Sequence, residues 1–362
     1  MISKEAVALG SKPTVKPAAT LRERKQVKPR SKRKTREAWT GFMYALPALA
    51  LLLLFRYWPL VFGMWISLWK WGYVPERFIG LDNYMRIFTE DLIVSDPAAG
   101  LELGAVAQAF MVTIFYAIGT IPLTLLLAFI VAYVLFHITK GKTLLRVLFF
   151  LPYITSHVAA AIVFKWIFHP SVGLANWGVR SMGGTPQQWL TDPDPILIKL
   201  ITTLGGQWPA AIPTVFAGPT WALAVIILFS IWSSLGFQII VFLSGMTQIP
   251  HDLTEAARMD GARTWNVIRH VTLPLLSPTW FLLTIISVIG AFESFNAFYV
   301  FSGGEGGPLG STMSLPLYIF RSFYVYGQIG YASAVSMVLF VLLLGLTWLQ
   351  LRYGEKKVHY MH

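Results

Sequence analysis

Long apolar runs separated by short polar segments are the dominant pattern of this chain. A helix needs about 20 mostly apolar residues to cross a hydrocarbon core of roughly 30 Å. Six runs meet this requirement, at about residues 42–69, 105–136, 144–168, 220–243, 279–301 and 332–351. Prolines within or at the start of three runs are tolerated where neighbouring helices satisfy the freed carbonyl groups. The pattern therefore predicts an all-α membrane protein with six transmembrane helices.

The composition supports a membrane location. Apolar residues make up 55% of the 362 residues and charged residues only 13%, whereas soluble domains carry about 25% charged residues. The chain has no cysteine, which excludes disulfides and thiolate metal sites. The first apolar run is far longer than the roughly 7–15 residues of a signal-peptide core, so we expect it to remain as an anchor.

Basic residues are concentrated in segments that fall on one side of the membrane if there are six spans. Residues 1–38 hold 12 Lys or Arg against 3 Glu and no aromatic residue, which predicts a disordered basic tail. The segments after the second, fourth and sixth runs are basic as well, and this bias places both termini in the cytoplasm. For the N-terminal tail we expect contact with anionic lipid and no binding of nucleic acid.

These features divide the chain into a tail at 1–38, a transmembrane domain at 39–353 and a short cytoplasmic tail at 354–362. The domain includes a long outer loop at 169–219 and a cytoplasmic loop at about 245–278. Within the outer loop, residues 196–219 carry a further apolar patch. The sequence leaves open whether this patch is an amphipathic surface helix or a short re-entrant piece.

The polar loop between the fourth and fifth runs predicts two short helices joined by a turn. Pro250 suits the first turn of a helix, and Glu255 follows where a carboxylate favours the positive end of the helix. Gly261 can adopt a positive φ and end this helix. A second helix can extend over residues 264–270, and Pro274 then breaks the chain before the fifth span. We expect an elbow at the membrane surface.

The residues of this loop resemble the EAA loop of permease subunits of binding-protein-dependent, ATP-driven (ABC) importers. The resemblance is carried by Glu255-Ala256-Ala257, Asp260-Gly261-Ala262 and Leu273-Pro274. The segment LFFLP at 148–152 and the stretch FNAFYVFSGGEGGP at 295–308 are similar to further motifs of the family, with Asn296 where the family has Asp. These similarities point to the carbohydrate-uptake branch, which includes maltose and glycerol-3-phosphate permeases.

The resemblance implies an assembly in the cytoplasmic (inner) membrane of a bacterium or archaeon. The expected partners are a second homologous permease, two ABC ATPase subunits and an extracytoplasmic solute-binding protein. The EAA loop would couple this chain to the ATPases, which would hold ATP and Mg²⁺. We expect this chain to bind no cofactor or metal and to be no enzyme.

The family places its solute contacts mainly on the spans before and after the loop. In the fourth run, polar and aromatic residues share one helical face at i, i+3, i+4 and i+7 spacing, with a glutamine beside them: Ser230, Ser233, Ser234, Phe237 and Gln238. The fifth run carries a similar stripe with an adjacent acid: Ser287, Gly290, Ala291, Glu293 and Ser294. Hydroxyls beside aromatic rings suit a sugar. Small residues also form helix-packing seams, and Glu293 can be a structural carboxylate near the outer surface.

Two other classes of function compete with an ABC permease. An ion-coupled secondary transporter needs acids inside the spans and often an internal repeat, but Glu293 is the one candidate acid. A membrane-embedded enzyme acting on lipid-linked sugar needs clustered acids or a metal site, and Asp192 and Asp194 lie in a Pro-rich turn instead. The chain contains no Walker A motif and no G-x-S-x-G nucleophile elbow, so the sequence offers no catalytic site.

Overall fold

The computed structural model describes residues 32–96, 100–209, 212 and 214–358. The chain divides into two compact units, residues 1–59 and 60–362, which are described separately. In the first unit, α1 (Lys32–Leu52) leads into a π-helical turn (Leu53–Tyr57), after which α2 (Trp58–Ile66) begins. Helix α1 starts inside the predicted disordered tail, so that prediction is wrong for residues 32–38, whose Lys, Arg, Glu and Ala favour helix. The rest of the tail lies outside the described residues.

Five helical segments of the described chain are long and apolar enough to cross a membrane: Glu37–Ile66, Ala105–His137 (α4), Trp221–Thr247 (α9), Ser277–Ser302 and Ile329–Gly354 (α16). The fourth of these comprises α13 (Ser277–Phe292) and, after a short interruption, α14 (Asn296–Ser302). These segments confirm five of the six predicted spans and the all-α membrane fold.

The predicted third span, 144–168, is not one straight helix. It consists of α5 (Lys142–Ile154) and α6 (His157–Ile167), which meet at an angle of 92°. Thr155 and Ser156 leave helical geometry at the corner, and the Ser156 hydroxyl accepts from the Ala159 amide as the N-cap of α6. The pair provides a sixth span only if both halves are counted as one.

Small elements fill the segments between the spans. Two antiparallel hairpins, which the all-α prediction did not include, pair β1 (Trp69–Trp71) with β2 (Pro75–Phe78) and β3 (Ile93–Asp96) with β4 (Gly100–Leu103). Between them lies α3 (Asp82–Thr89). The predicted outer loop, 169–219, contains α7 (Leu174–Ser181), α8 (Ile196–Thr203) and a 3₁₀ turn at Thr214–Ala217. Helix α8 covers the first part of the apolar patch at 196–219 that the sequence left unassigned.

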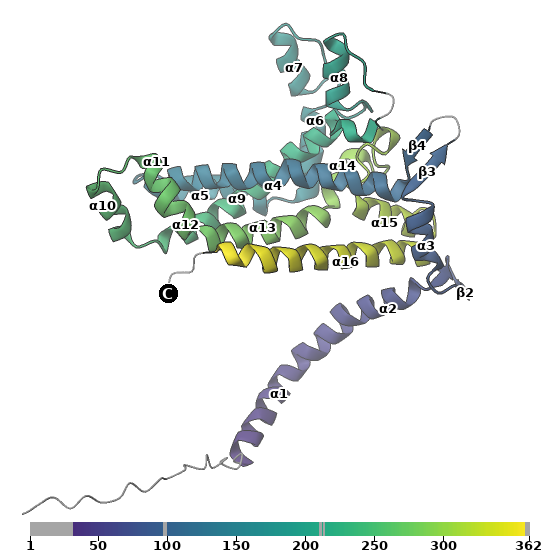
Figure 1. Cartoon of the computed structure of the whole chain (residues 1–362), viewed down its shortest axis with the longest axis horizontal. Coiled ribbons are helices and arrows are strands. Elements are labelled where there is room, and N and C mark those ends of the chain that lie inside the picture. The colour runs from purple at the N-terminus through teal and green to yellow at the C-terminus, as the bar shows by residue number, and fades with distance from the viewer. Residues whose placement is uncertain (1–31, 97–99, 210–211, 213, 359–362) are drawn as a thin grey trace, which may run out of the picture. The chain divides into compact units, whose positions relative to one another are not determined.

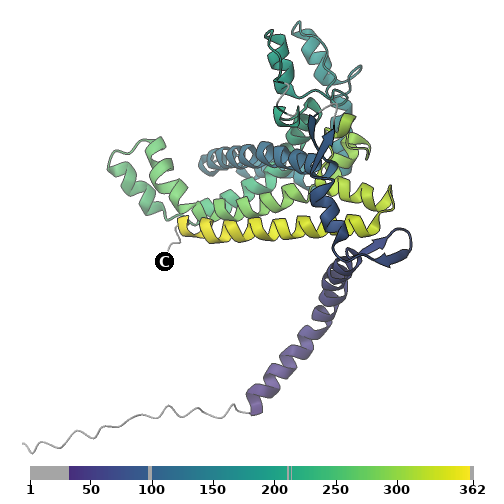
Figure 2. The same ribbon diagram turned by 45° about the vertical axis from the view of Figure 1, so that its right-hand side comes forward.

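The remaining elements follow α9 and α14. The loop after α9 contains α10 (His251–Met259), α11 (Thr264–Val267), a π-helical turn (Ile268–Thr272) and α12 (Leu273–Leu275). After α14 come a 3₁₀ turn (Pro308–Gly310), α15 (Leu315–Tyr324) and α16, which ends in a 3₁₀ turn at Glu355–Lys357. In the second unit, α10 and α11 lie at the same end as the C-terminus of α16, and α14, α15 and the β3–β4 hairpin lie at the other (Figures 1 and 2).

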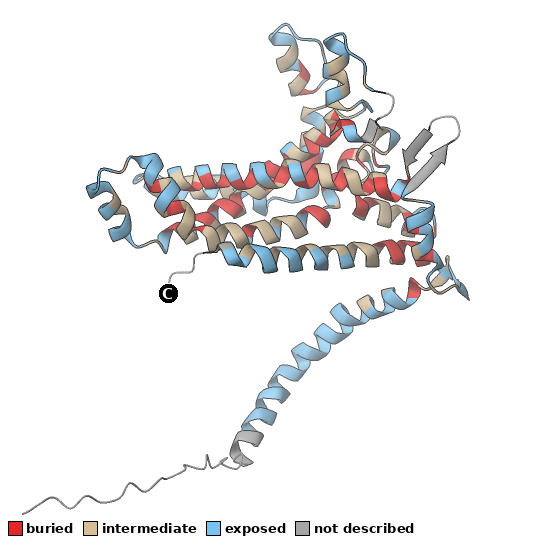
Figure 3. Cartoon of the chain, in the orientation of Figure 1, coloured by how far each residue is buried: buried red, intermediate tan, exposed pale blue. Residues whose placement is uncertain are grey.

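Helices α4 and α9 form the centre of the second unit. Buried residues concentrate along both (Figure 3), and they include Phe129 from α4 and the fully buried Phe229 and Phe242 from α9. Close approach of α5 to α9 depends on Gly236, because a Cβ there would lie 2.2 Å from the carbonyl oxygen of Phe149. The packing fixes α4, α5, α9 and α13 around one shared space.

Candidate functional site

A cavity of about 400 Å³ lies between α4, α9, α13 and the corner of α5 and α6. This volume lies in the range of small-molecule sites, roughly 300–1,000 Å³. All ten residues that the sequence predicted for the solute path line it: Ser230, Ser233, Ser234, Phe237, Gln238, Ser287, Gly290, Ala291, Glu293 and Ser294. The two predicted stripes therefore face one cavity and do not form a closed packing seam.

The α9 wall of the cavity has defined hydrogen-bond roles. The hydroxyls of Ser233 and Ser234 donate to the carbonyl of Ser230, at 3.2 and 2.7 Å. Gln238 is buried, and its Nε2 donates to Ser287 Oγ on α13 at 3.2 Å. Its Oε1 is buried without a hydrogen-bond partner among the described residues. The hydroxyls of Ser233 and Ser234 therefore offer the cavity oxygen lone pairs.

The corner between α5 and α6 supplies a wall that the sequence analysis missed. Tyr153 stacks on Phe237, with ring centroids 5.2 Å apart and planes 22° apart. His157 begins α6 and also lines the cavity. The sequence signal was Pro152 followed by Thr155 and Ser156, which favour a helix end and a new N-cap.

Helix α4 supplies the third wall, which the sequence analysis also missed. Tyr116, Thr120 and Thr124 line the cavity and follow one another at i, i+4 and i+8 in an otherwise apolar helix. The Thr124 hydroxyl donates to the Thr120 carbonyl at 2.7 Å, and Ser294 Oγ donates to the Tyr116 hydroxyl at 3.3 Å. This polar spacing in the second run was the available signal.

Glu293 lies at the cavity where α13 ends. It is the C-cap of α13, and its backbone amide donates to the carbonyls of Ala291 and Ile289. Its side chain is exposed, lines the cavity and forms no ion pair among the described residues. Glu293 thus lies on the same cavity as the serine stripes, whichever of the two predicted roles it has.

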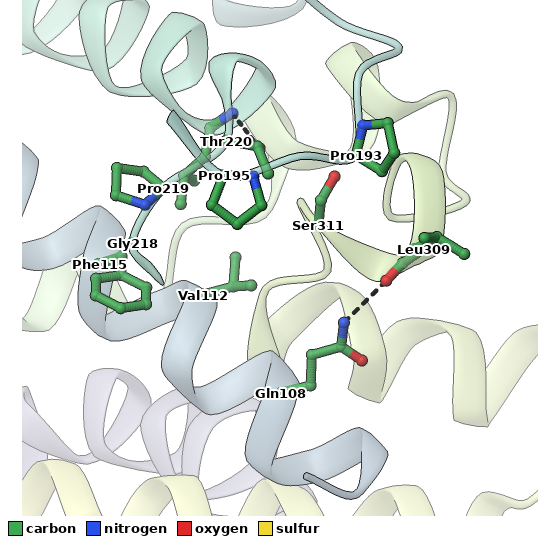
Figure 4. A pocket seen from close by; sticks show the side chains of 11 residues that line it. Gln108, Val112, Phe115, Pro193, Pro195, Gly218, Pro219, Thr220, Leu309 and Ser311 are labelled. Carbon is green, nitrogen blue, oxygen red and sulfur yellow. Dashed lines mark hydrogen bonds between the residues drawn. The ribbon is translucent and has the colours of Figure 1, made fainter. Parts of the chain in front are cut away.

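A second, smaller cavity of about 170 Å³ lies beside the start of α4 (Figure 4). Its walls come from the beginning of α4, the segments around Pro193 and Pro219, and the glycine-rich segment before α15. Gln108 Nε2 donates to the Leu309 carbonyl at 2.8 Å, and Leu309 has a positive φ of 51°. The Gln108–Leu309 hydrogen bond ties the glycine-rich segment to α4. Among the described residues this cavity has no charged lining side chain.

The loop after α9 has the predicted elbow geometry. Helix α10 ends in a Schellman motif: the Ala262 amide donates to the Ala257 carbonyl and the Gly261 amide to the Arg258 carbonyl. Gly261 has a φ of +81°, which glycine adopts without the strain that a Cβ adds. Pro250 is the N-cap, one residue before the predicted position. The elbow is thus set by local hydrogen bonds.

The second arm of the elbow differs from the prediction at Pro274. The helical backbone continues through Pro274 and the turn at Leu276, which keeps right-handed helical φ and ψ, so the predicted break is wrong. The π-helical turn just before it contains His270, whose carbonyl would otherwise meet the proline ring. The Leu273 amide instead donates to the Ile268 carbonyl. The elbow therefore leads into α13 through helical backbone.

The elbow is exposed in this chain. Leu253, Met259 and Trp265 expose 45%, 87% and 65% of their surface. Glu255 is also exposed and lies 3.0 Å from His251 one turn earlier. Apolar side chains at this level of exposure on a short helix favour a docking surface.

A helical membrane bundle with a polar cavity and an exposed elbow between two cavity-lining helices defines a solute permease. The chain matches the family of binding-protein-dependent transport system inner membrane components over residues 97–355 and belongs to it. It is therefore a membrane-spanning permease subunit of an ABC importer.

Relatives and solved structures agree with this family. The trehalose/maltose transport system permease protein of Thermococcus litoralis is 31% identical over 327 residues, covering 90% of this chain and 97% of the relative. The lactose transport system permease protein of Rhizobium radiobacter is 29% identical and covers 86% and 92%. The crystal structure of a bacterial ABC transporter that imports the acidic polysaccharide alginate aligns with a TM-score of 0.69 at 20% identity, over 91% of this chain and 99% of that chain.

Proposed function

We propose that this chain and a second, homologous permease form the translocation path of an ATP-driven importer for a sugar or sugar-like solute. The observation that carries the proposal is the place of the elbow. It connects α9 to α13, and these two helices supply eight of the ten predicted path residues, with Glu293 and Ser294 directly after α13. Force applied to the elbow is thus passed to two walls of the cavity.

Two ABC ATPase subunits are the proposed source of that force. Each would bind ATP and Mg²⁺ on its own chain, and one would dock on α10 through the exposed Leu253, Ala256 and Met259. The EAA residues would then act as coupling residues: Glu255, Ala256, Ala257, Asp260, Gly261, Ala262, Leu273 and Pro274. This chain itself would bind no cofactor and catalyse no reaction.

The distribution of charge supports the proposed orientation. The loop start of α5 (Lys142), the elbow (Arg258, Arg263) and the end of α16 (Arg352) lie at one end of the second unit. Asp82, Asp91 and Glu305 belong to segments at the other end. Because basic loops stay in the cytoplasm, we place the elbow and both termini there. The N-terminal tail would then meet anionic lipid.

A sugar suits the chemistry of the cavity. Hydroxyl and amide groups alternate there with the stacked Tyr153 and Phe237, and a sugar presents both hydroxyls and C–H faces. The relatives named above transport trehalose, maltose and lactose by their names. The alginate importer was solved with a pentasaccharide-bound periplasmic protein, which supports delivery by an extracytoplasmic binding protein.

Co-purification tests the coupling role of the elbow. Glu255→Lys reverses the charge of an exposed carboxylate on the docking face, and we expect it to lower the amount of ATPase subunit that co-purifies by more than about tenfold, because a docked surface is complementary to the native charge. The matched control is Glu305→Lys, an exposed glutamate of the glycine-rich segment, which should leave the ATPase bound. ATPase retained at the wild-type ratio in Glu255→Lys would contradict docking at α10.

A further inference from the structure

We infer that the cavity selects uncharged sugars and rejects acidic sugars and phosphorylated polyols. This inference rests on the proposed function and narrows its substrate class. Relatives of this chain cover both classes: the alginate importer takes up an acidic polysaccharide, and a 26% identical permease of Yersinia pestis belongs to a glycerol-3-phosphate transport system. Membership in the family therefore leaves the charge of the solute open. We infer that charge from the residues that line the cavity.

The first argument is the direction of the hydrogen bonds. Ser233, Ser234 and Thr124 donate their hydroxyl protons to backbone carbonyls, a common arrangement for Ser and Thr in helices. Each then offers the cavity only oxygen lone pairs. Gln238 donates its amide N–H to Ser287, and its Oε1 is buried away from the cavity. The three hydroxyl side chains are therefore the acceptors that a solute can satisfy with donors.

The second argument is charge. Glu293 and His157 line the cavity, and no Lys or Arg does so among the described residues. A carboxylate accepts hydrogen bonds and donates none. It attracts the O–H groups of a neutral sugar and repels a phosphate or a uronate at short range. Phosphate and uronate groups are themselves acceptors when ionised, so they would leave the Glu293 oxygens without donors.

A neutral sugar fits both the acceptor groups of the cavity and its negative charge. Its hydroxyls supply donors to the acceptor-rich walls, and its C–H faces can lie against the stacked rings of Tyr153 and Phe237. An acceptor that loses water and gains no donor carries a cost, and Glu293 is the one acidic acceptor that lines the cavity among the described residues. Glu293 is therefore the proposed specificity-determining residue of this chain.

Uptake by the complete importer tests the inference. The complex with its partner permease, ATPases and binding protein is reconstituted in proteoliposomes. Radiolabelled trehalose, maltose and lactose represent neutral solutes, and glycerol-3-phosphate and an alginate trisaccharide represent acidic ones. We expect ATP-dependent uptake of at least one neutral sugar and none of the acidic solutes. Glu293→Arg should lower that uptake by about tenfold through loss of an acceptor, with a smaller loss in Glu293→Gln and none in the surface control Glu305→Arg.

The outcomes separate the inference from the proposed function. ATP-dependent uptake of an acidic solute at a rate similar to or above the neutral sugars would overturn the inference and leave the importer function standing. Unchanged neutral-sugar uptake in Glu293→Arg, with the ATPases still co-purifying, would overturn the role of Glu293. Absence of ATP-dependent uptake for every solute would overturn the proposed function and the inference together.

Discussion

Two glycines of the second unit have opposite surroundings. A Cβ on Gly236 would lie within 3 Å of backbone atoms of α5, whereas a Cβ on Gly290 meets nothing within 4 Å. Gly236 therefore serves the packing of α9 against α5, and Gly290 leaves space in the cavity. The sequence analysis placed Gly290 on the solute stripe but had no signal for Gly236, because the close contact comes from a helix that bends back toward α9.

Substitutions at these glycines should separate stability from transport. Gly236→Ala forces α5 away from α9, and we expect a loss of about 1–3 kcal/mol in the free energy of unfolding, read as a lower thermal midpoint of the purified chain. Gly290→Ala should keep or slightly raise the midpoint, because its methyl group enters open space and Ala favours helix over Gly. A midpoint that falls equally in both variants would contradict this difference in packing between the two sites.

A larger residue at Gly290 tests the cavity itself. Gly290→Leu fills part of the space between α13 and α9, and we expect solute uptake to fall by at least about tenfold if the solute loses its place there. The thermal midpoint should stay near that of the wild type. Gly345→Leu in α16, where a Cβ also meets nothing within 4 Å, serves as the control and should transport normally.

At the level of elements, two π-helical turns relieve the same clash, between a proline ring and the carbonyl group four residues earlier. Each ends just before an X-Pro pair, at Trp58-Pro59 and at Leu273-Pro274. The residue four before each proline lies inside the π turn, where its carbonyl is displaced from the ring. The second arm of the elbow and its continuation into α13 are therefore helical from Thr264 onward, so a force on α11 would reach α13 through helical backbone.

The turn at Gly261 gives a sharp test of the elbow. Gly261→Ala keeps a small side chain but strains the positive φ, so we expect about 1 kcal/mol of destabilisation confined to the turn. Gly261→Asn should be tolerated better, because Asn visits this conformation more readily. ATPase activity stimulated by the loaded binding protein is the measurement, and the order wild type, Asn, Ala is expected. Equal activity in all three would show that the turn does not transmit the coupling.

Some elements could be predicted from the sequence and others could not. Hydrophobic run length was enough for five spans, and the Gly261 turn follows from local chemistry alone. The corner at Thr155 and Ser156 was not predicted, because the length of an apolar run does not show whether the helix bends within it. Tyr153 and His157, which line the cavity at this corner, were missed for the same reason. The hairpins were missed because Trp69–Trp71 and Pro75–Phe78 are too short for a periodicity to be read. Pro274 was misassigned because a π turn is not visible in the pattern.

On the scale of the whole second unit, the cavity and the elbow belong to one mechanical path. Helix α9 lines the cavity with Ser230 to Gln238 and ends at Thr247, three residues before Pro250 begins the elbow. Helix α13 leaves the elbow and lines the cavity again from Leu283 onward. Under the proposed function, movement of the elbow would change the distance between these two walls. Import by the proposed function requires the cavity to open to opposite sides of the membrane in different nucleotide states.

Cysteine accessibility in the assembled importer tests this requirement most directly, because the natural chain has no cysteine. Three single-cysteine variants are labelled with a membrane-impermeant maleimide: Ser287→Cys in the cavity, Lys140→Cys in the exposed loop between α4 and α5 and Glu305→Cys in the glycine-rich segment. Lys140→Cys should react only from the cytoplasmic side and Glu305→Cys only from the outer side, in every state.

Ser287→Cys should react from the outer side only when a non-hydrolysable ATP analogue and the loaded binding protein are both present, and from the cytoplasmic side without nucleotide. Labelling of Ser287→Cys from one and the same side in both states would contradict the account.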